Sequence, residues 1–151
     1  PICLADGQKV RTGPDASRGR VLWLRSDSTK ANPMQLLTKE QTAALLANGA
    51  QSANGDIDPY PVVKLFTPDA QATWLLTELD PTDPDLAFGL CDLGLGCPEL
   101  GYVRLSEIRE VRGRPRLPVE RDLWFTAAGP LSAYAAAARR AERIVELEAV
   151  A

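Results

Sequence analysis

Four short apolar runs, separated by turns rich in proline and glycine, constrain the fold of this chain more than any other feature. The runs are VVKLFT, ATWLLTEL, LAFGLCD and GYVRL, at residues 62–67, 72–79, 86–92 and 101–105. Each has the length and the β-branched, aromatic or leucine content that is typical of a strand. Because successive strands joined by short turns pair as antiparallel neighbours, the sequence predicts a β-meander of these four strands.

A helix is predicted directly before the strands, over residues 38–48. Thr38 and Gln41 form the T-x-x-Q pattern of a capping box, in which each side chain binds the backbone N–H of the other residue. Asn48 and Gly49 are predicted to end this helix, because glycine readily takes the left-handed conformation that follows a last helical turn.

A longer helix is predicted after the strands, over residues 130–147, with Pro130 at its first position. Its leucine, tyrosine and alanine residues recur at spacings of three and four, which indicates an amphipathic helix that packs closely on a sheet. A short helix at 106–111, capped by Ser106, and a last strand at 116–126 complete the pattern. We therefore predict an α+β fold, in which an antiparallel meander sheet of four to five strands packs against N- and C-terminal helices that share one face.

The alternation of side chains along the strands predicts the core. Trp74 and Leu76 fall on one face of the second strand. Leu75 and Leu79 fall on the other face, so both faces of the sheet are partly apolar. The residues predicted to form the core are Trp74, Leu76, Phe88, Leu90, Tyr102, Leu123 and Phe125.

The first part of the chain differs from the rest. Residues 1–33 contain six lysines and arginines against three aspartates, and only VLWL at 21–24 has the composition of a strand. Met34, the only methionine, follows directly. We interpret residues 1–33 as a flexible or non-native N-terminal extension and Met34 as the natural start, so that residues 34–151 form a single α+β domain.

The composition indicates the compartment. No apolar run approaches the roughly 20 residues that a membrane-spanning helix needs. Three cysteines, an odd number in a chain without a signal peptide, favour reduced thiols over a disulfide framework. We expect a cytoplasmic protein that does not contact a membrane.

The chain contains no histidine, and this excludes Ser-His-Asp catalysis, Cys-His catalysis and His-ligated zinc in their usual forms. A carboxylate-based or metal-dependent enzyme stays open as an alternative. The glycine-rich stretch at residues 87–102 lacks the spacing of a dinucleotide site, and Cys91 and Cys97 are too far apart for a zinc knuckle. We predict no catalytic residue, no cofactor and no metal.

Charge is distributed unevenly along the chain. Seven acidic residues and no lysine or arginine lie between Leu65 and Val103, whereas six arginines and three glutamates lie between Arg104 and Arg121. From Met34 onward, eleven basic and seventeen acidic residues give a net charge of −6. The two blocks can neutralise each other or be solvated, or the acidic block can bind a basic protein or imitate the phosphates of DNA.

These alternatives define two candidate surfaces. The acidic candidate surface consists of Glu78, Asp80, Asp83 and Asp85. The alternative is a loop that contacts the phosphates of a nucleic acid through Arg112, Arg114 and Arg116. The negative net charge opposes binding to phosphate, so we favour a non-enzymatic interaction protein with a protein partner over the nucleic-acid alternative.

Four phrases of the sequence support a resemblance to a known family. They are LLTKEQTAALLANG, the stretch from PVVKLF to RLSEI at residues 61–108, LPVERDLWF and PLSAYAAAAR. In this order they are similar to the bacterial domain-of-unknown-function family numbered twenty-nine fifty-eight, from about Met34 to Arg140. The resemblance implies a small bacterial protein that is often encoded on plasmids and integrated elements, near antirestriction or DNA-maintenance genes. It implies no catalytic residues, and it favours a DNA-handling protein as the partner.

Overall fold

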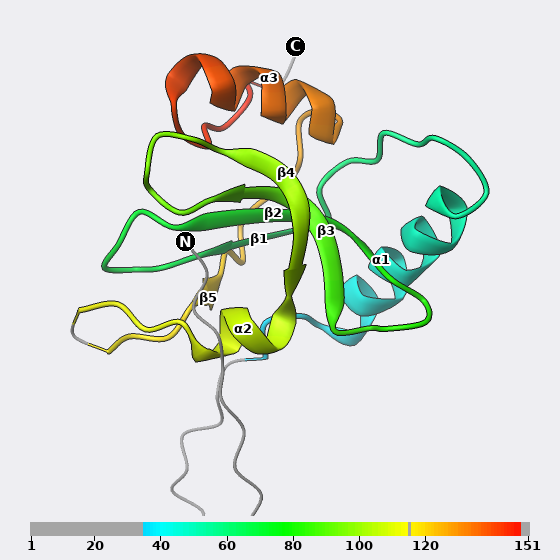
Figure 1. Ribbon diagram of the computed structural model, residues 1–151, viewed down its shortest axis with the longest axis horizontal. Helices are drawn as coiled ribbons and strands as arrows, with labels where there is room; N and C mark the ends of the chain where they lie inside the picture. Colours follow the sequence, from blue (N-terminus) through cyan, green and yellow to red (C-terminus); the bar gives the residue numbers. More distant parts are fainter. Residues whose placement is uncertain (1–34, 115, 149–151) are drawn as a thin grey trace, which may run out of the picture. The chain divides into compact units, whose positions relative to one another are not determined.

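The computed structural model describes residues 35–114 and 116–148. The predictions for residues 1–33 and for Met34 lie outside this part of the chain. The structure confirms the predicted α+β fold, with a five-stranded antiparallel sheet in the order β4-β3-β2-β1-β5 (Figure 1). The strands are β1 Val63–Phe66, β2 Thr73–Leu79, β3 Leu86–Asp92, β4 Glu99–Arg104 and β5 Glu120–Arg121. Strands β1 to β4 form the predicted meander, and β5 returns to the opposite edge, beside β1.

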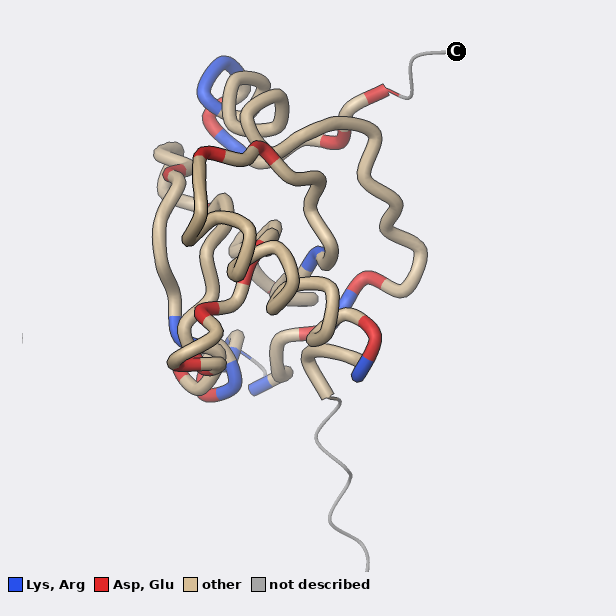
Figure 2. Tube along the Cα trace, turned by 90° about the vertical axis from the view of Figure 1, so that its right-hand side faces the viewer, with Lys and Arg blue, Asp and Glu red and all other residues tan. Residues whose placement is uncertain are grey.

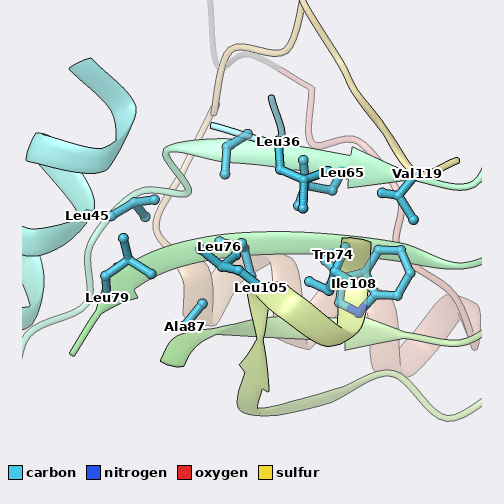
Figure 3. Close-up of a cluster of buried hydrophobic side chains, with 11 residues drawn as sticks. Leu36, Leu45, Leu65, Trp74, Leu76, Leu79, Ala87, Leu105, Ile108 and Val119 are labelled. Carbon is cyan, nitrogen blue, oxygen red and sulfur yellow. The ribbon is translucent and has the colours of Figure 1, made fainter. Parts of the chain in front are cut away.

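The helices lie on both faces of the sheet, so the prediction that they share one face is wrong. They are α1 Lys39–Ser52, α2 Leu105–Glu110 and α3 Leu131–Ala141. One hydrophobic cluster joins α1 and α2 to the face that carries Trp74 and Leu76 (Figure 3). A second cluster joins α3 to the face that carries Leu75 and Leu90. Because β2 directs large apolar side chains to both sides, each face needs a covering layer.

A β-bulge in β2 changes the predicted face of Leu79. The pairing of β2 with β3 shifts between Leu76 and Glu78, which leaves Thr77 as an extra residue. The extra residue resets the alternation, and Leu79 therefore joins the same cluster as Leu76 instead of lying on the opposite face with Leu75. A strict period of two along the sequence does not predict this change.

The start of α1 is confirmed and its end is not. Thr38 Oγ1 accepts a hydrogen bond from Gln41 N at 3.1 Å, and Gln41 Oε1 accepts one from Thr38 N at 3.0 Å. The helix continues past Gly49 to Ser52. A Cβ at Gly49 would lie 1.9 Å from the carbonyl oxygen of Leu79, so this glycine allows α1 to approach β2 closely instead of ending the helix.

Helix α3 is shorter than the predicted segment 130–147. It ends at Ala141, because Glu142 takes a left-handed conformation with φ of 56°. After this turn the chain packs back on the second cluster through Ile144 and Leu147. The apolar contacts that were predicted for the last turns of a longer helix are therefore made with the second cluster by an irregular segment. Among the described residues, no helix has the length and apolar character needed to cross a membrane.

The predicted core is confirmed for Trp74, Leu76 and Leu90, which are buried. Phe88 and Phe125 are partly buried and pack against the second cluster. The prediction is wrong for Tyr102 and Leu123, and each error has a physical reason.

Tyr102 lies on the edge strand β4, and its side chain is 68% exposed. It packs against Phe88 with 5.0 Å between the ring centroids. Helix α3 packs on Leu75 and Leu90, which lie on β2 and β3, so the edge strand remains uncovered.

Leu123 is 66% exposed because the predicted strand at 116–126 contains only the two residues of β5. Directly after β5, the carboxylate of Asp122 accepts a hydrogen bond from Trp124 N at 3.0 Å. This side-chain bond closes a turn and ends the pairing with β1.

Candidate functional site

The acidic candidate surface lies at the turn between β2 and β3. Asp80 Oδ1 accepts hydrogen bonds from the backbone N–H and the hydroxyl of Thr82, both at 2.7 Å. These bonds hold the pKa of Asp80 below its usual value, and the bond from the Thr82 hydroxyl has the largest effect. Glu78 is half-buried on β2 and lines a cavity of about 230 Å³ with Asp80, next to the end of α1.

Asp83 and Asp85 of this surface bind the basic block that follows them in the sequence. Arg104 Nη1 lies 3.0 Å from Asp83 Oδ2 and 3.5 Å from Asp85 Oδ2, and Arg109 Nη1 lies 3.8 Å from Asp85 Oδ1. The charges of the acidic candidate surface are thus partly neutralised. Figure 2 shows acidic and basic segments close together in the lower part of the coloured trace.

Asp85 also replaces Ser106 in its predicted role as the cap of α2. Its Oδ1 accepts a hydrogen bond from Ser106 N at 2.9 Å, and its Oδ2 accepts one from the Ser106 hydroxyl at 2.6 Å. The hydroxyl bond is the main cause that lowers the pKa of Asp85 below its usual value, and Arg104 adds to it. Ser106 lies inside the helix, so it cannot act as the cap itself.

The three arginines of the alternative surface do not act alike. The guanidinium of Arg112 donates to the carbonyl groups of Arg109 and Val111, at the C-terminal end of α2. Arg114 and Arg116 are exposed in the loop that follows, which is closed by a hydrogen bond from Gly113 N to Leu117 O at 3.2 Å. All three arginines are exposed, but Arg112 is held at the end of α2 by these hydrogen bonds, which Arg114 and Arg116 do not share.

An exposed apolar pair, Leu123 and Trp124, follows β5, at a position that the sequence predicts to lie within a strand. The side chain of Trp124 is 91% exposed, and that of Leu123 is 66% exposed. Asp122 fixes this turn, since its Oδ1 accepts from Trp124 N and its Oδ2 lies 3.3 Å from Lys64 Nζ. The pattern LWF resembles the interior of a strand, and for this reason burial was predicted for Leu123 and Phe125.

A small cavity opens beside Trp124, on the same side of the sheet as α3. Its volume is about 240 Å³. Residues that line it include Asp122, Trp124, Phe125, Tyr134, Glu146 and Leu147. The cavity combines aromatic walls with two carboxylates.

Lys64 pairs with both carboxylates of this cavity. Its ammonium nitrogen lies 2.7 Å from Glu146 Oε1 and 3.3 Å from Asp122 Oδ2, and 5.9 Å from the centroid of the Phe125 ring. Burial disfavours the charged form of Lys64, but the hydrogen bonds to Glu146 and Asp122 outweigh it and raise the pKa of this lysine. The fold therefore holds a cation between carboxylates and an aromatic ring at this position.

A second group of exposed apolar residues lies at the opposite edge of the sheet, on β4 and the loop before it. It consists of Leu93, Leu95, Leu100 and Tyr102. In the same loop, Gly94 and Gly96 have φ angles of 76° and 80°, which confirms the predicted glycine-rich turn.

Cys91 and Cys97, which we considered as metal ligands, differ in their surroundings. Burial raises the pKa of the Cys91 thiol to about 11, whereas Cys97 is exposed. Within residues 35–114 and 116–148, no three side chains of the types Cys, Asp and Glu are grouped so that they could hold a metal ion.

Comparisons with known proteins agree with the resemblance seen in the sequence. The profile of a family described as "Protein of unknown function (DUF2958)" matches residues 36–145. Neither a search of curated proteins nor a search of solved structures gave a significant match. The matched segment begins two residues before Thr38, the first residue of the α1 capping box, and ends in the segment after α3, so it includes every helix and strand of the described residues. The chain belongs to the DUF2958 family of proteins of unknown function.

Proposed function

We propose that this protein is a non-enzymatic interaction protein that binds another protein through Leu123 and Trp124. The observation that carries the proposal is the 91% exposure of Trp124. Tryptophan is highly buried on average, and it is enriched among the residues that dominate the energy of protein interfaces. Leu123, its neighbour in the chain, is also an exposed apolar residue. The turn that carries both residues is fixed by Asp122, so the surface is formed before a partner binds.

The charge of the protein supports a basic partner. The net charge of −6 from Met34 onward attracts a basic surface over a distance and raises the rate of encounter. Glu78 and Asp80 contribute to this negative potential. Asp83 and Asp85 contribute less, because Arg104 forms ion pairs with both. The family resemblance favours a DNA-handling protein as the partner, and an accessory role for mobile genetic elements in antirestriction or DNA maintenance. We propose the cytoplasm as the place of action.

Affinity capture with matched variants tests the proposal. The full chain is immobilised and incubated with lysate of a bacterium that encodes it. A partner that the natural chain captures should be lost with Leu123→Ser combined with Trp124→Ser, and retained with Tyr102→Ser, which removes an exposed aromatic residue from the other edge. Retention by the double variant, or equal loss with Tyr102→Ser, would show that Leu123 and Trp124 are not the binding surface.

Contact with a nucleic acid is a second candidate function, favoured by the exposed side chains of Arg114 and Arg116 in one loop. Each phosphate contact steepens the salt dependence of binding. Changing both arginines to alanine should then lower the slope of log K against log salt by about two. Arg112→Ala is not a suitable test, because Arg112 binds the end of α2. Equal slopes for the natural chain and the double variant would exclude this loop as a phosphate-binding site.

A further inference from the structure

We propose that the cavity beside Trp124 binds an arginine side chain of the basic partner. This inference rests on the proposed function and names the chemical group that the surface recognises. The cavity, of about 240 Å³, admits a single side chain. A guanidinium group can stack on the exposed face of Trp124 and at the same time donate hydrogen bonds to a carboxylate at its edge.

Glu146 is the carboxylate that fits this role. Its side chain is 75% exposed, and Lys64 binds its Oε1. Among the described residues, Glu146 Oε2 has no hydrogen-bond partner. Asp122 is less suited, since Trp124 N occupies its Oδ1 and Lys64 lies against its Oδ2. An arriving guanidinium would therefore pair with Glu146 through its Oε2.

The local charges are complementary to a cation. Asp122 and Glu146 carry two negative charges against the single positive charge of Lys64, so the cluster keeps one negative charge. Lys64 itself shows that this position accepts a cation between carboxylates and beside an aromatic ring. Arginine fits better than lysine as the second cation, because its planar group can stack on an indole and pair with a carboxylate at once.

Nuclear magnetic resonance can test this with the indole N–H signal of Trp124. The full chain carries ¹⁵N-tryptophan, and the signal is identified by its loss in Trp124→Phe. The probe is the peptide acetyl-Gly-Arg-Gly-amide, with the neutral citrulline peptide of the same shape as its control. We expect the arginine peptide to shift the Trp124 signal with a Kd on the order of 1–10 mM, as for a single charged contact, and the citrulline peptide to leave it unchanged.

Two acid-to-amide variants decide whether the binding is local. Glu146→Gln should weaken binding of the arginine peptide at least about fivefold. Glu107→Gln removes one exposed carboxylate from α2, outside the cavity, and should leave the Kd unchanged. Equal weakening by both variants, or an equal shift with the citrulline peptide, would overturn the inference.

Peptide binding and partner capture test the arginine site and the proposed function separately. A Trp124 signal that moves with protein concentration alone would show that a second copy of this chain covers the surface, which overturns the arginine site. If the captured partner is lost with the Leu123 and Trp124 variant but the arginine peptide does not move the Trp124 signal, the proposed function stands and this inference fails.

Discussion

Asp92 and Ile144 join the end of β3 to the segment that follows α3: Asp92 Oδ2 accepts a hydrogen bond from Ile144 N at 2.9 Å. Its other oxygen accepts one from Gly94 N at 2.8 Å, and the side chain is buried. One carboxylate thus satisfies two backbone donors, and it fixes the position of the segment that carries Glu146.

Replacing Asp92 with alanine should therefore destabilise the fold. The change removes two hydrogen bonds to a charged group and leaves the N–H of Ile144 without its partner, which costs about 2–4 kcal/mol of the free energy of unfolding. Urea unfolding measures the loss. Asp56→Ala, at an exposed position in the loop after α1, is the control and should change the free energy by less than about 0.5 kcal/mol. A loss below 1 kcal/mol for Asp92→Ala, roughly one ordinary hydrogen bond, would contradict this account.

Gly49→Ala gives a test in which two effects have opposite signs. Helix propensity alone predicts a gain of about 1 kcal/mol for this change inside α1. The structure predicts a loss instead, because the new Cβ would lie 1.9 Å from the Leu79 carbonyl oxygen. We expect the free energy of unfolding to fall by about 1–3 kcal/mol, as for other overpacked sites. Ala50→Gly, at an exposed position of the same helix, should cost about 1 kcal/mol by propensity alone.

Gly89 and Gly101 form a matched pair on neighbouring strands, since they are partners across β3 and β4. A Cβ at Gly89 would lie 2.0 Å from the Leu75 carbonyl oxygen, whereas a Cβ at Gly101 would meet nothing within 4 Å. Gly89→Val should destabilise the protein by about 1–3 kcal/mol or more, and Gly101→Val should be neutral or stabilising. Thermal unfolding of the two variants side by side checks this, and equal effects would show that β2 does not approach Gly89 so closely.

The stability that Asp85 contributes should depend on pH. Because the pKa of Asp85 is lowered in the folded state, chiefly by the Ser106 hydroxyl, its contribution is present above the unfolded value near pH 4 and is lost as the pH falls through the folded value. The difference in free energy of unfolding between the natural chain and Asp85→Asn should be largest above about pH 5 and should shrink below about pH 4.

Chemical denaturation of both proteins at several pH values measures this difference. Both proteins contain Asp80, so its own pH-dependent contribution cancels. Ser106→Ala takes away the main cause of the lowered pKa of Asp85. The free energy of unfolding of this variant should therefore also fall less steeply in acid than that of the natural chain. A difference that stays constant from pH 7 to about pH 3 would be inconsistent with a lowered pKa of Asp85.

Cys91 and Cys97 should react with thiol reagents at different rates. In a Cys3→Ser background, Cys97 should react rapidly at neutral pH, and Cys91 should react only slowly, because it is half-buried and its pKa is raised to about 11. Absorbance at 412 nm with Ellman's reagent follows both phases. Cys97→Ser should abolish the rapid phase and change the free energy of unfolding by less than about 0.5 kcal/mol. Two rapid thiols in the folded protein would contradict the burial of Cys91.

The parts of the fold that depend on local interactions were predictable from the sequence. The capping box needs only Thr38 and Gln41, three residues apart, and the structure confirms it. The meander follows from the short turns between β1 and β4. The end of α1 was not predictable, because it depends on the approach of Gly49 to Leu79, thirty positions later in the chain and on another element.

The candidate site depends even more on contacts between distant segments. The sequence shows an acidic block and a basic block, but it does not show that Arg104 pairs with Asp83 and Asp85. The exposure of Trp124 follows from the early end of β5, which is set by a two-residue pairing with β1 and by the turn at Asp122. Strand propensity alone favours a strand that continues past Asp122, so the sequence does not predict an exposed surface at Leu123 and Trp124.

The bulge at Thr77 shifts the alternation of side chains along β2 by one residue. Even-numbered residues before the bulge and odd-numbered residues after it therefore face the same side of the sheet. The bulge also frees a backbone acceptor, because the Thr77 carbonyl receives a hydrogen bond from Asn48 Nδ2 at 2.8 Å, and this bond ties α1 to the strand. Deleting Thr77 would remove the bulge and this acceptor together, and the strict alternation that remains would keep Leu79 on the face of Leu76. Helix α1 would then keep its apolar contact with the sheet and lose only its polar anchor. The extra residue thus gives α1 an attachment point on β2 while both apolar faces of the strand stay as they are.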